Sequence, residues 1–173
     1  TQGYSSAASD VYKRQVHKGD VFFIESGTLH AIGKGILIAE IQQNSNTTYR
    51  VYDYGRVGKD GKPRELHIEK AIDVTELCPP KYDTKPQGKP VKIDGGEETL
   101  LRSCEYFDVH KIKVSGTVTL DADEKSFMSV LVLDGSGKIG ELDAKKGDSF
   151  FVPAGYGRFT LTGNLEVILS DIV

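Results

Sequence analysis

The C-terminal half of this chain alternates short apolar runs with turn-forming residues. From Glu98 onward, runs rich in Val, Ile, Leu, Phe and Thr recur at short intervals, and Gly, Asp or Asn separates them. Such runs are typical of β-strands joined by tight turns, and about eight of them in succession favour a β-sandwich or jelly roll. The predicted strands are LLRSC, YFDVHKIKV, TVTL, FMSVLVL, KIGEL, SFFV, RFTL and LEVILS.

The region before Cys78 shows the same pattern with one interruption. Val21–Ile24, Gly35–Ile41 and Thr48–Tyr54 predict strands of one sheet. Pro63 then precedes RELHIEKAIDVTEL, in which the apolar residues do not alternate, and a proline suits the first turn of a helix. We therefore expect an all-β fold in which one short helix follows the first group of strands.

Two stretches without periodicity predict the limits of the units. Residues 1–15 are small and polar, and we expect them to form a non-native or disordered leader. The segment CPPKYDTKPQGKPVKIDGG, which begins at Cys78, holds four of the six prolines and is typical of a connection. The sequence thus predicts units at 16–80 and 98–173, joined by a linker at 81–97.

Composition and charge exclude several classes of partner. The 22 basic and 25 acidic residues give a formal net charge of -3 without a basic stripe, so we expect no nucleic-acid partner. No apolar run approaches the roughly 18 residues that cross a bilayer, so we expect no membrane partner. Cys78 and Cys104 lie far apart in the sequence and have no second thiol nearby. Free thiols of this kind favour a reducing, cytoplasmic compartment.

An internal repeat links the two units. KGDVFFIESGTLH, from Lys18 to His30, aligns without a gap with KGDSFFVPAGYGR, from Lys146 to Arg158. Each copy combines a Gly-Asp turn, a Phe-Phe strand and a second glycine that can adopt positive φ. The last position of the repeat is a histidine in the first copy and an arginine in the second.

The first copy resembles the second conserved motif of the cupin superfamily, in which the histidine of Gly-x-x-His is a metal ligand inside a β-barrel. Glu25 stands where that family usually has proline, whereas the second copy has Pro153. The stretches GTLHAIGKGILIAEIQQNSNTTYRVYDYGR and DGKPRELHIEKA are similar, more specifically, to type I zinc-dependent mannose-6-phosphate isomerases. The resemblance is strong from Lys18 to about Val74 and looser through Val173.

This resemblance implies a fold and a set of site residues. It makes 16–80 the C-terminal part of a catalytic cupin, an incomplete barrel, and 98–173 a degenerate cupin with a closed barrel, since Arg158 cannot bind a metal. The family holds zinc with a glutamine, two histidines and a glutamate. The last of these histidines falls on His30, and the other three ligands lie upstream. The catalytic arginine of the family falls on Arg50.

The remaining assignments complete a site for a hexose 6-phosphate. Glu40 matches an acidic residue of the family's pocket, and either Glu40 or a metal-bound water is the candidate base. Arg56 and Lys34 are candidate phosphate ligands, although solvated surface charge is the alternative for both. We expect His67 to pack against or cap the helix. We also expect the side chains of His30, Glu40 and Arg50 to line one concavity.

Three functions compete at this point. The first is a fragment of an aldose-ketose isomerase that interconverts mannose 6-phosphate and fructose 6-phosphate through an enediol and is inactive alone. The second is a metal-free carbohydrate-binding or regulatory cupin. The third, another metal-dependent cupin enzyme such as an oxygenase, fits TYRVYDYGR and RELHIEKA less well. If the first is correct, the incomplete barrel exposes apolar surface, because Phe22, Phe23, Ile36 and Ile38 cannot all be sheltered.

Overall fold

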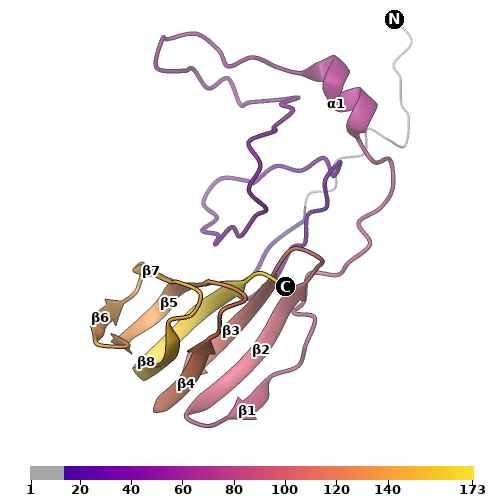
Figure 1. The fold of residues 1–173 in the computed structure, drawn as a ribbon. Helices are drawn as coiled ribbons and strands as arrows, with labels where there is room; N and C mark the ends of the chain where they lie inside the picture. The colour runs from indigo at the N-terminus through magenta and orange to yellow at the C-terminus, as the bar shows by residue number, and fades with distance from the viewer. Residues whose placement is uncertain (1–13) are drawn as a thin grey trace, which may run out of the picture. The chain divides into compact units, whose positions relative to one another are not determined.

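The computed structural model describes residues 14–173, which divide into two compact units (Figure 1). The N-terminal unit runs to Asp83, and the C-terminal unit comprises Thr84–Val173 together with Gly19–Val21. This division falls inside the segment predicted as a linker. Residues 1–13 of the predicted leader lie outside the described part of the chain.

The C-terminal unit is built entirely from strands, as the sequence predicts. LEVILS and RFTL, predicted as separate strands, form one continuous strand, and KIGEL is divided between two neighbouring strands. The strands are β1 (Val91–Ile93), β2 (Gly96–Ser103), β3 (Asp108–Val114), β4 (Thr117–Ala122), β5 (Met128–Ile139), β6 (Leu142–Lys145), β7 (Ser149–Val152) and β8 (Gly157–Asp171).

The two longest strands organise the sheet. β5 and β8 pair in an antiparallel fashion from Met128, which faces Asp171, to Ile139, which faces Leu161. The other edge of β8 pairs first with β4 and then with β3, while the other edge of β5 pairs with β7 and then with β6. The hydrogen-bonded order is β1-β2-β3-β8-β5-β6, with β4 on β8 and β7 on β5.

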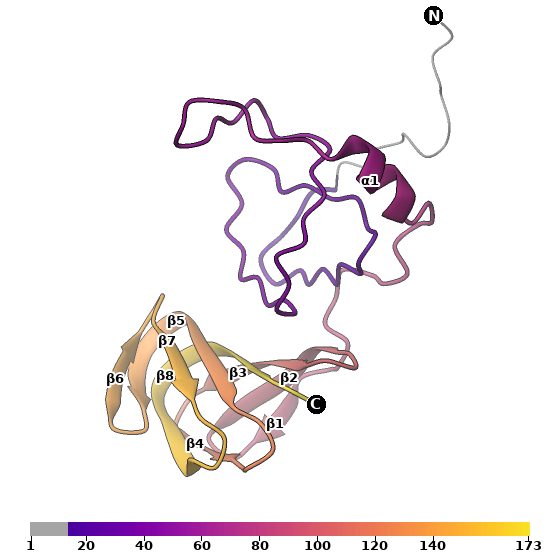
Figure 2. The ribbon, with the colours of Figure 1, turned by 45° about the horizontal axis from the view of Figure 1, so that its top comes forward.

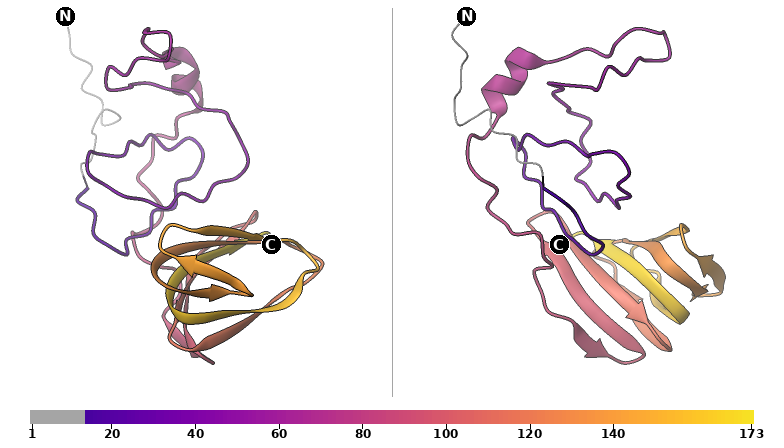
Figure 3. Two further views of the ribbon diagram at one scale, coloured as in Figure 1. Left: turned by 90° about the vertical axis from the view of Figure 1, so that its left-hand side faces the viewer. Right: turned by 180° about the vertical axis from the view of Figure 1, so that it is seen from behind.

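A line of glycines lets this sheet fold over on itself. Gly163 in β8 donates a backbone hydrogen bond to the oxygen of Gly116, between β3 and β4, at 3.1 Å, and it faces Gly137 of β5. A Cβ on Gly137 would lie 1.9 Å from the oxygen of Thr162, so the strands approach here more closely than any side chain permits. The strands curl over one another as a result (Figures 2 and 3).

The folded sheet encloses one apolar core. Side chains that alternate along β3, β4, β5 and β8 meet in it, and Ile112, Val130, Leu161 and Val167 have no exposed surface. At about 25 cal/mol per Å² of buried apolar surface, these residues supply the main stabilisation of the unit. The all-β cupin or jelly-roll prediction is confirmed.

The predicted closed barrel is wrong. The hydrogen-bonded path begins at β1 and ends at β6, so the sheet is open. Gly137 and Gly163 let β5 and β8 approach each other closely, so the sheet folds over the core without a ring of hydrogen bonds. The sheet covers its core by folding over, so its two end strands, β1 and β6, do not need to pair.

The N-terminal unit contains one helix, α1 (Ile68–Val74), and no strand among its described residues. The predicted strands Val21–Ile24, Gly35–Ile41 and Thr48–Tyr54 are therefore wrong for this structure. A strand requires a neighbour that accepts its amide hydrogens. Within the described part of the chain, no backbone hydrogen bond joins any two of these three segments.

The predicted helix is present but shorter than expected, because the residues between Pro63 and Ile68 pair with an earlier segment instead. The exposure prediction is confirmed: Phe22, Ile36 and Ile38 are exposed and Phe23 is half-buried. Leu37 has 93% of its surface exposed. No helix among residues 14–173 is long and apolar enough to cross a membrane.

Candidate functional site

The two copies of the sequence repeat form the same pair of turns. In the first turn, Gly19 and Gly147 have φ values of 94° and 90°. In the second turn, the amide of Thr28 donates to the oxygen of Glu25 at 3.1 Å, and the amide of Tyr156 donates to the oxygen of Pro153 at 3.2 Å. The glutamate therefore closes the same turn as the proline. The segment between the turns is a strand only in the second copy, where it forms β7.

His30 follows the second turn of the first copy and is exposed. Its Nδ1 lies 2.8 Å from the carbonyl oxygen of Thr28. A carbonyl only accepts hydrogen bonds, so Nδ1 carries the proton and the lone pair of the neutral ring is on Nε2. Metal-binding histidines are commonly oriented by such a bond on the second nitrogen. The local geometry therefore suits His30 to the ligand role that the sequence predicts.

Arg50 begins a hairpin-like arm that returns to it at His67. The amide of His67 donates to the oxygen of Arg50 at 2.7 Å, and the amide of Arg50 donates to Nδ1 of His67 at 3.1 Å. The side chain of Arg50 donates from Nη1 to the backbone carbonyl oxygen of Glu65 at 3.2 Å. Both the backbone and the guanidinium of Arg50 are thus held by the returning segment of the arm, at Glu65 and His67.

The middle of the arm is joined by an ion pair. Arg64 donates from Nε to Oδ2 of Asp53 at 2.5 Å and from Nη2 to Oδ1. The Nε of Arg50 lies 4.0 Å from Oδ1 of the same carboxylate. The hydrogen bond from Arg64 lowers the pKa of Asp53, partial desolvation opposes this, and the charges of Arg64, Arg50 and Arg56 add to the lowering. Three arginines therefore surround one carboxylate.

A tight turn places Arg56 in this cluster. The amide of Arg56 donates to the oxygen of Asp53 at 2.9 Å, and the two residues between them, Tyr54 and Gly55, have φ values of 54° and 67°. Positive φ at both central positions is typical of a type I′ turn, and Tyr54 adopts it without the freedom of glycine. The guanidinium of Arg56 also lies 5.8 Å from the centre of the Tyr54 ring.

The remaining predicted site residues are not brought into contact with this arm. Glu40 and Lys34 are exposed, and no hydrogen bond or ion pair in the described part of the chain joins His30, Glu40 and Arg50 to one another. No group of three potential metal ligands occurs among residues 14–173. The shared concavity and the roles of these residues stay predictions.

His67 occupies the N-cap position of α1, where the sequence places it, but its side chain makes no capping hydrogen bond. The ring lies 6.1 Å from that of Tyr49 and accepts the amide hydrogen of Arg50 instead. A histidine acceptor for an amide 17 positions away leaves no periodic trace in a sequence.

Asp53 and Arg64 were also missed. The sequence signals that could have found them are the Tyr54-Gly55 and Asp60-Gly61 pairs, since pairs of a residue and a glycine often mark the turns of a hairpin. A hairpin between Arg50 and His67 would have placed the aspartate opposite the arginine.

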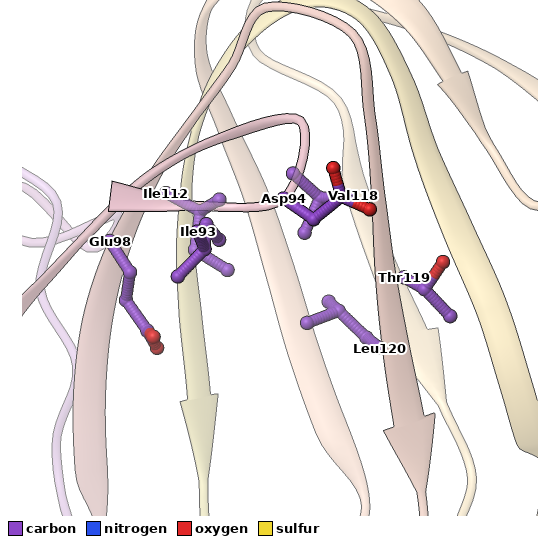
Figure 4. A pocket seen from close by; sticks show the side chains of 7 residues that line it. All are labelled: Ile93, Asp94, Glu98, Ile112, Val118, Thr119 and Leu120. Carbon is purple, nitrogen blue, oxygen red and sulfur yellow. The ribbon is translucent and has the colours of Figure 1, made fainter. Parts of the chain in front are cut away.

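The C-terminal unit contains a separate cavity of about 230 Å³ between β1, β2, β3 and β4 (Figure 4). Its charged lining residues are Asp94 and Glu98, and Glu98 lies 2.9 Å from Nδ1 of His110. The cavity is smaller than the roughly 300–1,000 Å³ of ordinary ligand pockets. Two carboxylates also repel a phosphate, so this cavity does not suit a sugar phosphate.

Comparisons with known proteins find similarity to mannose-6-phosphate isomerases. A family model described as the cupin domain of mannose-6-phosphate isomerase matches residues 96–172. The chain is 43% identical over 162 residues to mannose-6-phosphate isomerase ManA of Bacillus subtilis, and 40% identical over 162 residues to the mannose-6-phosphate isomerase of Streptococcus mutans. Each alignment covers 91% of this chain and 50% of the relative.

A solved structure supports the same relationship. The mannose 6-phosphate isomerase from Bacillus subtilis matches with a TM-score of 0.62 and 36% identity, over 74% of this chain and 41% of that one. The chain spans about half the length of the curated relatives it matches. This chain is therefore similar to mannose-6-phosphate isomerases over most of its length, and residues 96–172 match the cupin domain of that family.

Proposed function

We propose that this chain is the C-terminal part of an aldose-ketose isomerase that interconverts mannose 6-phosphate and fructose 6-phosphate through an enediol. The observation that carries the proposal is the fixed guanidinium of Arg50, the residue that the resemblance assigns to the family's catalytic arginine. Its guanidinium is held at Nη1 by Glu65, and its side chain keeps 22% of its surface exposed. Within the described residues, its Nη2 has no hydrogen-bond partner and remains available to a ligand.

Arg50 is suited to stabilise negative charge on the enediolate. An arginine keeps its proton throughout the reaction, and one preorganised donor is typically worth about 3 kcal/mol in the transition state. The base that moves the proton between C1 and C2 is Glu40 in this proposal, with a metal-bound water as the alternative. Arg56 and Lys34 bind the phosphate of the hexose 6-phosphate, and the surplus positive charge around Asp53 supports that role for Arg56.

We infer that the metal is zinc and that His30 is one of its ligands. The hydrogen bond from Nδ1 to Thr28 leaves Nε2 as the coordinating atom. When bound, zinc supplies a Lewis acid that polarises the sugar oxygens. We also expect the protein to act in the cytoplasm, since Cys78 and Cys104 are free thiols.

The test compares two proteins in a coupled assay of mannose 6-phosphate isomerisation with added zinc. One is this 173-residue chain, and the other is the chain joined to the N-terminal half of the Bacillus subtilis relative. We expect activity from the joined protein only. Arg50→Ala should lower kcat/KM by about 10²–10³-fold, and His30→Ala should lower zinc content and activity together.

Arg158→Ala is the matched control, because Arg158 occupies the position of His30 in the second copy of the repeat. Its side chain is 82% exposed and lies 3.7 Å from Asp121. We expect unchanged activity and zinc content. If Arg50→Ala keeps the activity of the joined protein, the proposed role of Arg50 is wrong. If the joined protein is itself inactive, a metal-free binding module becomes the better description of this chain.

A further inference from the structure

Arg50 faces a carboxylate that another arginine already occupies. The fork of Arg64 hydrogen-bonds both oxygens of Asp53, whereas Nε of Arg50 stays 4.0 Å from Oδ1, beyond hydrogen-bonding distance. An arginine that is fully paired with a carboxylate has its charge neutralised and its donors engaged. The arrangement at Asp53 therefore leaves Arg50 without a hydrogen bond to this carboxylate, although Nη1 of Arg50 donates to the backbone oxygen of Glu65.

We propose that Arg64 is a positioning residue that prevents Asp53 from capturing Arg50, while His67 fixes the backbone of Arg50. This inference rests on the proposed function and adds three residues to it. The carboxylate serves as an electrostatic guide: it attracts the guanidinium of Arg50 into place but cannot bind it. Without Arg64, the same carboxylate is free to form a bidentate pair with Arg50 and to draw it away from the substrate.

The arm has the geometry that this role requires. The carboxylate of Asp53 is only 11% exposed, so solvent competes weakly for it. The arm returns through an isolated bridge between Val57 and Pro63, which brings Arg64 back opposite Asp53. Two hydrogen bonds between Arg50 and His67 close the arm at its base: one joins backbone atoms, and in the other the amide of Arg50 donates to the ring Nδ1 of His67.

The kinetic test uses the joined protein described above. We expect Arg64→Ala to lower kcat by about tenfold to a hundredfold, since displacement of a reacting group by about 1 Å can cost that much. The change in KM should be smaller. Adding Asp53→Asn to Arg64→Ala removes the competing carboxylate and should recover most of kcat. If the ion pair between Asp53 and Arg64 is purely structural, the double variant should recover no kcat relative to Arg64→Ala, because it lacks both partners of the pair.

Two further variants separate positioning from folding. His67→Asn keeps an acceptor at the position of Nδ1 and should retain activity, whereas His67→Ala should lose about tenfold in kcat. Lys59→Ala removes one positive charge from the same arm and should change nothing. A double Asp53→Asn/Arg64→Ala variant no more active than Arg64→Ala overturns the proposal.

A spectroscopic arm keeps this inference separable from the proposed function. In the 173-residue chain with ¹⁵N-labelled arginine, the Nε–H resonance of Arg50, assigned through its loss in Arg50→Lys, should shift in Arg64→Ala and return in the double variant. If these shifts occur and the joined protein is inactive, the proposed function fails and the positioning inference holds. If Arg64→Ala leaves the resonance unmoved, the inference is wrong even for an active enzyme.

Discussion

Gly137 is the position at which the folded sheet of the C-terminal unit can be tested most directly. A Cβ at this residue would lie 1.9 Å from the oxygen and 3.0 Å from the carbonyl carbon of Thr162, both of them backbone atoms of β8. Backbone atoms cannot rotate away as a side chain does, so Gly137→Ala must push β5 and β8 apart. Overpacking of this kind typically costs about 1–3 kcal/mol, and we expect the upper part of that range.

Gly116 is the matched control on the same line of glycines. A Cβ there would meet its nearest atom, the Cα of Gly95, at 3.7 Å, which is ordinary van der Waals contact. Its φ is not in the left-handed region. Gly116→Ala should therefore be neutral or slightly stabilising, by up to about 1 kcal/mol, because alanine restricts the unfolded chain.

The assay is urea unfolding followed by far-ultraviolet circular dichroism. For an m-value of about 2 kcal/mol per M, a loss of about 3 kcal/mol lowers the midpoint of Gly137→Ala by about 1.5 M. The midpoint of Gly116→Ala should equal or exceed that of the parent chain. Equal destabilisation by both substitutions would refute the reasoning, since it would show that the stability of the folded sheet does not depend on the close approach of β5 to β8 at Gly137.

Three further outcomes are expected. Burial is the largest cause that raises the pKa of Asp171, whose Oδ1 is buried without a hydrogen-bond partner, so the charged form of this carboxyl is unfavourable in the folded chain. Asp171→Asn should therefore stabilise the chain near pH 7, but not at a pH below the ordinary range of carboxyl pKa values, where the carboxyl is protonated. Urea denaturation at both pH values tests this. Leu161→Ala, at a fully buried position, should cost about 2–5 kcal/mol in the same urea assay. Zinc titration of the 173-residue chain should show no tight site, and His30→Ala should leave the titration unchanged.

The fold of the C-terminal unit could be predicted because its information is local. Each strand of this unit carries its own alternation and its own turn residues, so β3 and β7 appear in the structure close to where the sequence places them. The open path of the sheet could not be predicted. The fold-over has Gly137 of β5 opposite Gly163 of β8, and Gly163 hydrogen-bonded to Gly116 in the turn between β3 and β4; no local pattern contains that register.

The N-terminal unit shows the opposite case. Its apolar segments have strand-like sequences, but a strand forms only when a partner is present. Ile36 and Ile38 therefore lie exposed in irregular segments. Arg50 and His30 could be assigned from family resemblance, whereas Asp53, Arg64 and His67 required the path of the arm, which brings residues up to 17 positions apart into contact.

The repeat indicates why metal chemistry is expected in one unit and not in the other. Both copies form the same two turns, with a glycine of positive φ in each, so the backbone that presents the last residue of the repeat is locally alike. The difference lies in the side chain presented. His30 offers a ring nitrogen whose orientation is fixed by the hydrogen bond to Thr28, whereas Arg158 offers a permanent positive charge beside Asp121. Arg158→His would remove this repelling charge but should not by itself create a zinc site, because one imidazole cannot hold zinc tightly. No second imidazole or cluster of carboxylates surrounds that position among the described residues.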